Sequence, residues 1–326
     1  MPICDTIIGN VSILDGTGGE ARPRSVAIER ERITAVGDLH GYSAQETIDG
    51  HGSVLAPGFI DVHTHDDLYV IRRPEMLAKL SQGVTTVIVG NCGISAAPVE
   101  LNGRLPDPMN LLGEATSFRY SRFRDYVAAV EASRPSLNVA ALVGHTALRN
   151  NHMDRLDRAA TADEITRMRS QLREALDGGA LGLSTGLAYL SANSASTEEV
   201  VGLAELLSKA GGIYTTHLRN EAASVLPAME EAFRIASLAN VPVVISHLKC
   251  SGIDNWGRSS EVLQSLEAAR TRQTVSCDCY PYAASSSTLD LRQVDERVTI
   301  TITWSDPHPK MAGKTLSEIA QVWQTA

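Results

Sequence analysis

The stretch VTTVIVGNCGIS, residues 84–95, joins a buried strand to a tight loop framed by glycines. Its first six residues are apolar or β-branched and turn residues follow at once, so the strand is expected to end just before Cys92. A thiol in this position is either a packed core residue or a group aimed at a site, because unpaired cysteines are among the most buried residue types. Asn91 and Gly93 leave little bulk around the thiol, which favours the second interpretation.

Short strands of this kind recur along the chain and alternate with helical patterns at residues 162–180 and 196–212. Thr161 and either Ser196 or Thr197 are expected to cap these helices, and glycine pairs follow their ends. Strand followed by helix, repeated, predicts a parallel α/β sheet. An open doubly wound sheet usually has a glycine-rich phosphate loop after its first strand, and the sequence has none there. The seven expected strands lie at residues 54–65, 84–91, 139–145, 180–186, 213–217, 242–249 and 274–280.

Two regions differ in their pattern. Residues 1–56 alternate short β runs with Gly- and Pro-containing turns, which predicts a small antiparallel sheet. Residues 57–284 hold the seven strands and predict a (β/α)8 TIM-like barrel that lacks one strand. The chain is therefore expected to end before strand eight.

Composition narrows the class of protein. The 326 residues are 43% hydrophobic and carry a formal net charge of -9, which argues against nucleic acids and anionic membranes as partners. Neither a bilayer-spanning apolar run nor a secretory leader is evident, so a cytoplasmic protein is expected. Five cysteines without regular spacing do not predict a disulfide framework.

Metal-capable residues follow several of the expected strands. His63 and His65 are two apart, so both point to the same side of a strand, and His217 and His247 each end an apolar strand. One such histidine is more often a hydrogen-bonded structural residue, but several at the ends of barrel strands converge on one face. Together with the Cys92 thiol they suit zinc, which accepts sulfur and nitrogen.

Other polar residues at strand ends are given different roles. His145 is expected to be loop-forming or close to a substrate. Cys277 and Cys279 share one side of the last strand and are expected to pack inside the barrel, with Asp278 on the opposite side. Metal ligation or a labile disulfide is the alternative for these two cysteines. A nucleophilic cysteine with one histidine base is an alternative for Cys92, but it does not explain the surplus of histidines. A serine triad has weaker support, because no GxSxG elbow occurs.

The motifs PGFIDVHTHDD, SQGVTTVIVGNCGIS, GLSTG, THLRNE, VISHLK and DCYPY together resemble the D-aminoacylases, zinc-dependent N-acyl-D-amino-acid deacylases of the amidohydrolase superfamily. The resemblance implies a distorted barrel beside a small β-sandwich. Residues 1–56 would form the N-terminal part of that sandwich, and residues 285–326 would begin an inserted subdomain.

The resemblance also implies roles for single residues. Cys92, His217 and His247 would hold a tightly bound Zn2+, and His63 and His65 would form a second, weaker site bridged by Cys92. Ser184 stands where many amidohydrolases have a metal-bridging lysine. Substrate contacts would come from four residues: Tyr280, Ser286, Tyr189 and Lys249. For Lys249 a solvated position is an open alternative.

The implied activity is hydrolysis of N-acyl-D-amino acids to a D-amino acid and a carboxylate. The family's catalytic aspartate lies in an SDG motif on strand eight; this sequence has no SDG, and Asp306 lies in the expected subdomain. No catalytic residue is therefore identified in the chain. Two alternatives stay open: a cyclic-amide hydrolase of the dihydroorotase or hydantoinase type, and a zinc-binding fragment that catalyses nothing.

Overall fold

A computed structural model describes residues 2–101, 103, 105–291 and 294–324. The chain divides into two compact units, the first made of Met1–Phe59 and Gly83–Thr85 and the second of Ile60–Gln82 and Thr86–Ala326. The domain limits expected after residues 56 and 284 stay predictions.

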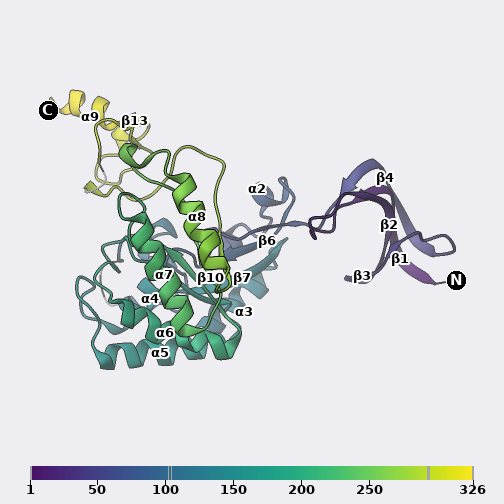
Figure 1. Cartoon of the computed structure of the whole chain (residues 1–326), viewed down its shortest axis with the longest axis horizontal. Helices are drawn as coiled ribbons and strands as arrows, with labels where there is room; N and C mark the ends of the chain where they lie inside the picture. The colour runs from purple at the N-terminus through teal and green to yellow at the C-terminus, as the bar shows by residue number, and fades with distance from the viewer. Residues whose placement is uncertain (1, 102, 104, 292–293, 325–326) are drawn as a thin grey trace. The chain divides into compact units, whose positions relative to one another are not determined.

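The first unit is a four-stranded sheet in the order β3-β2-β1-β4 (Figure 1). Its strands are β1 (Ile3–Ile13), β2 (Arg22–Glu29), β3 (Arg32–Gly37) and β4 (Ser43–Leu55). β1, β2 and β3 pair in antiparallel fashion, as expected, but β4 runs parallel to β1. The prediction of a wholly antiparallel sheet was wrong because β4 crosses from the β3 edge to the opposite edge, beside β1.

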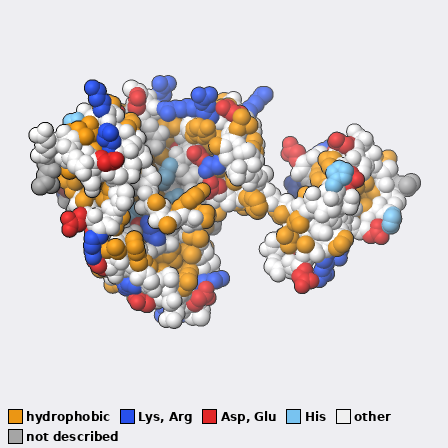
Figure 2. Space-filling model, turned by 90° about the horizontal axis from the view of Figure 1, so that it is seen from above, with side chains coloured by type: hydrophobic (Ala, Val, Ile, Leu, Met, Phe, Trp, Pro, Cys, Tyr) orange, Lys and Arg blue, Asp and Glu red, His pale blue; other side chains and the backbone are white. Residues whose placement is uncertain are grey.

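Large apolar side chains stay at the surface of both units (Figure 2).

Most of a seven-stranded sheet lies in the second unit, and its spatial order follows chain order from β5 to β11. The strands are β5 (Phe59–Asp61), β6 (Val84–Val89), β7 (Asn138–Gly144), β8 (Gly182–Gly186), β9 (Ile213–His217), β10 (Val243–Ile245) and β11 (Val275–Cys277). The pairs from β6 to β11 are parallel. Sequential order without a reversal is typical of a barrel and excludes a doubly wound sheet, which has a switch point.

Helices connect these strands, and several of them pack against the sheet (Figure 1). They are α1 (Tyr69–Arg72), α2 (Leu77–Leu80), α3 (Phe123–Ser133), α4 (His145–His152), α5 (Ala162–Asp177), α6 (Thr197–Ala210), α7 (Val225–Ala239) and α8 (Ser259–Arg270). The caps expected for α5 and α6 are confirmed: Thr161 forms a capping box with Glu164, and Ser196 accepts from the backbone of Glu199.

The core of the second unit lies between the sheet and helices α5 to α8. It includes Leu183, Tyr214 and Ile245 from the strands and Leu203 and Phe233 from the helices. Because the helices bury the outer face of the sheet, the ends of the strands are free to present polar groups.

The final segment adds β12 (Thr301–Ile302), β13 (Lys314–Thr315) and α9 (Leu316–Trp323). Among the described residues no helix is both long and apolar enough to span a bilayer.

Candidate metal centre

Metal-capable side chains follow the carboxyl ends of four strands of the second unit. His63 comes two residues after β5, Cys92 three after β6 and His247 two after β10, while His217 ends β9. The carboxyl ends of parallel strands meet at one edge of a sheet, so residues far apart in sequence come together there. This is the edge at which the sequence predicted a site.

The loop after β6 turns the Cys92 side chain toward the neighbouring strands. Cys92 has φ +54°, a left-handed conformation that is unusual for a side chain larger than glycine, and Gly90 and Gly93 beside it also have positive φ. A Cβ on Gly93 would lie 2.6 Å from the backbone nitrogen of Gly186. The loop therefore packs against β8 backbone to backbone, which requires glycine.

Hydrogen bonds fasten this loop at both ends. The buried Ser184 hydroxyl of β8 donates to the Gly90 carbonyl at 2.5 Å and accepts from the Gly93 nitrogen at 3.0 Å. The buried Asp67 carboxylate accepts from the backbone nitrogens of Gly90 and Ala96 at 3.2 and 3.0 Å. Such support explains how a non-glycine residue keeps a left-handed conformation. Ser184 thus holds the loop that carries the thiol.

Gly186→Ala is expected to destabilise the second unit by about 1–3 kcal/mol, because the new Cβ would overpack a filled space. It would lie 2.2 Å from the Cys92 carbonyl oxygen, and backbone cannot move aside cheaply. Gly202→Ala in α6 is the matched control: its Cβ would meet no atom closer than 3.7 Å, and alanine favours a helix. Urea unfolding measures both variants, and equal changes in unfolding free energy would contradict the proposed close packing.

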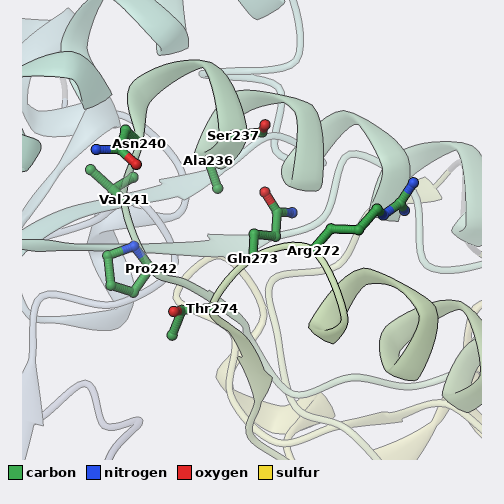
Figure 3. A pocket seen from close by; sticks show the side chains of 8 residues that line it. All are labelled: Ala236, Ser237, Asn240, Val241, Pro242, Arg272, Gln273 and Thr274. Atoms are coloured by element: carbon green, nitrogen blue, oxygen red, sulfur yellow. The ribbon is translucent and has the colours of Figure 1, made fainter.

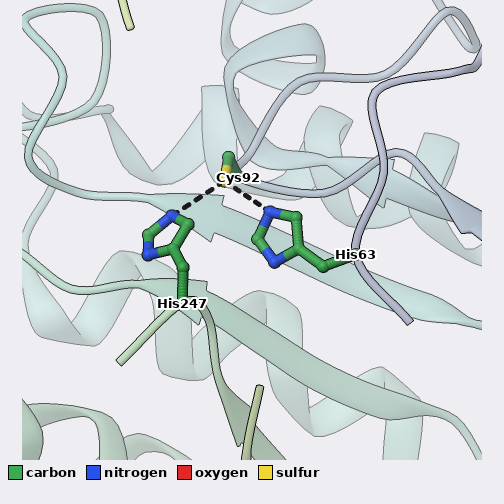
Figure 4. Close-up of side chains that lie close together, drawn as sticks. All are labelled: His63, Cys92 and His247. Atoms are coloured by element: carbon green, nitrogen blue, oxygen red, sulfur yellow. Dashed lines mark hydrogen bonds between the residues drawn. The ribbon is translucent and has the colours of Figure 1, made fainter. Parts of the chain in front are cut away.

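Two histidines approach the Cys92 thiol from different strands (Figure 4). His63 Nε2 lies 3.1 Å and His247 Nε2 lies 3.4 Å from Cys92 Sγ. These three donor atoms form one set within 4.8 Å of one another, and His217, Glu221 and His247 form a second such set. His247 belongs to both sets. Among the described residues these are the two groupings found, so Cys92 and His217 fall in different sets and His65 in neither.

The protonation states around the thiol suit a cation. Burial lowers the pKa of both His65 and His217 to about 3, with help from neighbouring histidines, so both imidazoles are neutral and keep a lone pair. Within the described chain, the Nδ1 atoms of these two residues lack a hydrogen-bond partner. Burial, with the nearby Glu221 and Asp278 carboxylates, raises the pKa of Cys92. A nucleophilic thiol needs the opposite shift, whereas a bound metal deprotonates its thiol outright.

Glu221 and Asp278 are site residues that sequence reasoning missed. Glu221 Oε1 lies 3.0 Å from His247 Nδ1, and burial raises the pKa of Glu221 while His217, His247 and Lys249 together lower it to about 2. The sequence feature that could have identified Glu221 is its position four residues after His217, from which a loop can return to the same strand end. Asp278 Oδ1 lies 3.1 Å from His63 Nδ1.

Asp278 was placed on the wrong side of its strand. The alternation of β11 is as expected, but Val275 and Cys277 pack against the helix-side core, which turns Asp278 inward. Cys279 is exposed rather than packed in the barrel. A one-residue error in register inverts every side chain of a strand, and a strand of only three residues cannot decide the register from sequence alone.

His145 was also misplaced. It opens α4 and is completely buried, and its Nε2 lies 2.9 Å from Glu199 Oε1, which Arg149 Nη1 also contacts at 2.5 Å. The chain turns into a helix directly after β7, and this brings the His145 side chain to the buried Glu199 of α6. His145 is therefore part of a structural network.

Three of the four expected substrate residues have contacts at or beside the centre. The Tyr189 ring is 4.7 Å from the His217 ring, and Lys249 Nζ lies 2.7 Å from Glu221 Oε1 and 2.8 Å from His247 Nδ1. Lys249 Nζ is also 5.9 Å from the centre of the Tyr280 ring. Ser286 is exposed on the segment that follows. Lys249 thus faces the centre, and the solvated alternative was wrong.

Two cavities lie at opposite ends of the strands. One of about 490 Å³ is lined by His217, Glu221 and residues after β9 and β10, so it adjoins the centre. The other, of about 270 Å³, is lined by Pro242 and Thr274, which precede β10 and β11 (Figure 3). The second cavity is at the amino-terminal face, where barrel residues serve stability rather than catalysis. The first cavity is the candidate substrate site.

Comparisons with known proteins agree with this geometry. The chain matches the sequence profile of the Amidohydrolase family over residues 46–274. It belongs to the amidohydrolase family. Over 316 residues it is 46% identical to a D-aminoacylase from Alcaligenes xylosoxydans xylosoxydans, with 97% of this chain and 65% of that protein covered.

Solved structures of amidohydrolases confirm the fold. A D-aminoacylase structure with a binuclear metal centre matches with a TM-score of 0.95 and 46% identity over 99% of this chain and 68% of that one. An N-acyl-D-glutamate deacylase from Bordetella bronchiseptica, in complex with zinc and a phosphonate inhibitor, matches with a TM-score of 0.92 and 41% identity over the same shares. The predicted α/β barrel and the predicted resemblance are thus confirmed. The chain spans 65% of the length of the curated D-aminoacylase.

Proposed function

We propose that this amidohydrolase cleaves the amide bond of N-acyl-D-amino acids with zinc as cofactor and releases a D-amino acid and a carboxylate. The observation that carries the proposal is the approach of two imidazole nitrogens to the buried Cys92 thiol, at 3.1 and 3.4 Å. The relative with 46% identity is a D-aminoacylase, which supports the same class of small-molecule substrate. A cytoplasmic location stays a prediction.

We propose Cys92, His217 and His247 as the residues that hold a tightly bound zinc ion. Cys92 and His217 belong to different donor sets, and His247, which belongs to both, would connect them. His63 and His65, with Cys92 between the two positions, would hold a second and weaker ion. A largely buried set of sulfur and imidazole donors fits zinc better than harder cations such as Mg2+. When bound, zinc polarises a carbonyl and acidifies water.

The chain's own residues would bind and orient the substrate. Tyr189 and Tyr280 would flank it, Ser286 would contribute a hydroxyl, and the Lys249 ammonium would supply positive charge for a substrate carboxylate. The carboxylates of Glu221 and Asp278 are held by His247 and His63, so we propose neither as the proton-transferring base.

The zinc-loaded protein is expected to release D-methionine from N-acetyl-D-methionine and to leave N-acetyl-L-methionine and hydantoin intact. Amine release measured with a fluorogenic reagent gives the rates. At the same zinc concentration, Cys92→Ser should lose roughly 90% or more of the activity, because it would lack the metal that polarises the carbonyl and acidifies water. Hydrolysis of hydantoin alone would favour a cyclic-amide hydrolase. Bound zinc with hydrolysis of neither substrate would favour the zinc-binding fragment that catalyses nothing. Full activity in the Cys92→Ser variant would contradict the proposal.

A further inference from the structure

A carboxylate lies directly behind one of the two histidines that face the thiol. Asp278 follows β11, and its two oxygens lie 3.1 and 3.2 Å from Nδ1 of His63. The opposite ring nitrogen of His63, Nε2, is the one that lies 3.1 Å from Cys92 Sγ. Both side chains are nearly buried, with 13% of His63 and 10% of Asp278 exposed. Carboxylate, imidazole and thiol therefore form a continuous chain from β11 to β6.

This arrangement decides where the histidine proton lies. A neutral imidazole has one N–H, and an ionised carboxylate can only accept a hydrogen bond. With Asp278 on Nδ1, the hydrogen lies on Nδ1 and the lone pair lies on Nε2, toward Cys92. A carboxylate in this position orients a metal-binding histidine and raises its basicity.

The same carboxylate supports a second histidine. Asp278 Oδ1 accepts a hydrogen bond of 2.6 Å from the backbone nitrogen of His247, which has φ +36°. Left-handed backbone in a residue other than glycine needs such support. The backbone of Asp278 is itself fixed, because its nitrogen donates to the Ile245 carbonyl and its carbonyl accepts from Leu248.

Glu221 stands behind His247 but cannot act in the same way. Its Oε1 is 3.0 Å from His247 Nδ1, yet the Lys249 ammonium, which can only donate, is 2.8 Å from the same nitrogen. An acceptor and a donor thus compete at one atom, and the proton of His247 is not assigned by its contacts. Asp278 has no such competitor among the described residues around His63 Nδ1.

We infer that Asp278 is a positioning residue of the metal centre, which fixes the His63 tautomer and the backbone of His247 so that both Nε2 atoms face Cys92. The inference rests on the proposed zinc site. Neither the sequence motifs nor the proposed ligand set assigns a role to Asp278.

Zinc affinity measured by competition with a chromophoric chelator tests this role. Asp278→Ala is expected to weaken zinc binding about 10- to 100-fold, the effect typical of removing such a partner. Asp278→Asn keeps one oxygen that can accept from His63 and His247 but loses the negative charge, so it should weaken zinc binding less than Asp278→Ala does. Cys277→Ala, the neighbouring change on the helix side of β11, is the control and should leave affinity unchanged.

A second measurement needs no variant and covers the case in which Asp278→Ala fails to fold. Long-range proton–nitrogen NMR of the zinc-loaded protein should find His63 protonated at Nδ1. A proton on Nε2, zinc affinity of Asp278→Ala within threefold of normal, or an Asp278→Asn variant as weak as Asp278→Ala would overturn the inference. Failure of the unchanged protein to bind zinc would instead refute the proposed metal site.

Discussion

Replacing Cys92 by serine is expected to weaken zinc binding by more than about 100-fold, which exceeds the effect of removing an outer partner of a ligand. Serine has nearly the same shape, but its hydroxyl does not ionise as a thiol does, so the centre would lose its soft anionic donor. The unchanged protein should retain zinc through dialysis against a weak chelator, and the variant should not. Elemental analysis of both proteins after dialysis measures the difference.

The histidines refine this expectation. His217→Ala should also lose the tightly held zinc, whereas His63→Ala should lose mainly the weaker ion. Cys250→Ser is a suitable control, because Cys250 is half-buried on the loop after β10 and is absent from both donor sets. Zinc that stays stoichiometric in Cys92→Ser, or that is lost equally from Cys250→Ser, would contradict the role of Cys92.

Glu199→Gln is expected to lower the free energy of unfolding by about 3–5 kcal/mol, because it leaves the buried Arg149 charge without its partner. The two side chains are 0% and 1% exposed, and Arg149 Nη1 lies 2.5 Å from Glu199 Oε1. Glu205→Gln on the same helix removes an exposed ion pair with Arg169 and should change stability by less than about 1 kcal/mol. Urea unfolding of the three proteins measures the contrast.

The same network predicts how stability depends on pH. Burial raises the pKa of Glu199, but His145 and Arg149 outweigh it and lower the pKa to about 2, below its ordinary value of 4.5. Because folding lowers this pKa, the ionised carboxyl group stabilises the folded state above pH 4.5. This stabilisation is lost as the pH falls toward 2. Burial also lowers the pKa of His145, so below pH 6.5 the unfolded chain binds more protons. Stability should therefore fall as the solution is acidified from pH 6.5.

Glu199→Gln should remove the carboxyl part of this acid-dependent loss. The double variant Glu199→Gln and Arg149→Met should unfold less easily than Glu199→Gln alone, since an unpaired buried charge costs more than a missing pair. Identical unfolding free energies for Glu199→Gln and Glu205→Gln would show that the buried network does not stabilise the fold.

The sequence predicts the barrel and much of the centre because both depend on short-range patterns. A strand such as residues 84–89 is apolar or β-branched throughout, and a glycine-framed turn after it identifies Cys92 as a strand-end residue. The carboxyl ends of parallel strands meet, so the proximity of Cys92 to His63 and His247 follows from the fold class.

Residues whose role depends on the exact register or on the path of the next element were beyond the sequence. Asp278 faces inward because Val275 and Cys277 face the helices, and a three-residue strand gives no sign of which choice is correct. His145 faces the helical layer because α4 begins directly at that residue. Glu221 comes from a loop, whose return to the strand end is a tertiary feature.

X-ray absorption at the zinc edge tests the central claim most directly, because it detects the atoms bound to the metal. The zinc-loaded protein should give a sulfur neighbour at about 2.3 Å and nitrogen neighbours at about 2.0–2.1 Å, and Cys92→Ser should lose the sulfur. A spectrum of the unchanged protein with only nitrogen and oxygen neighbours, or a sulfur neighbour that persists in Cys92→Ser, would contradict a metal centre built on this thiol.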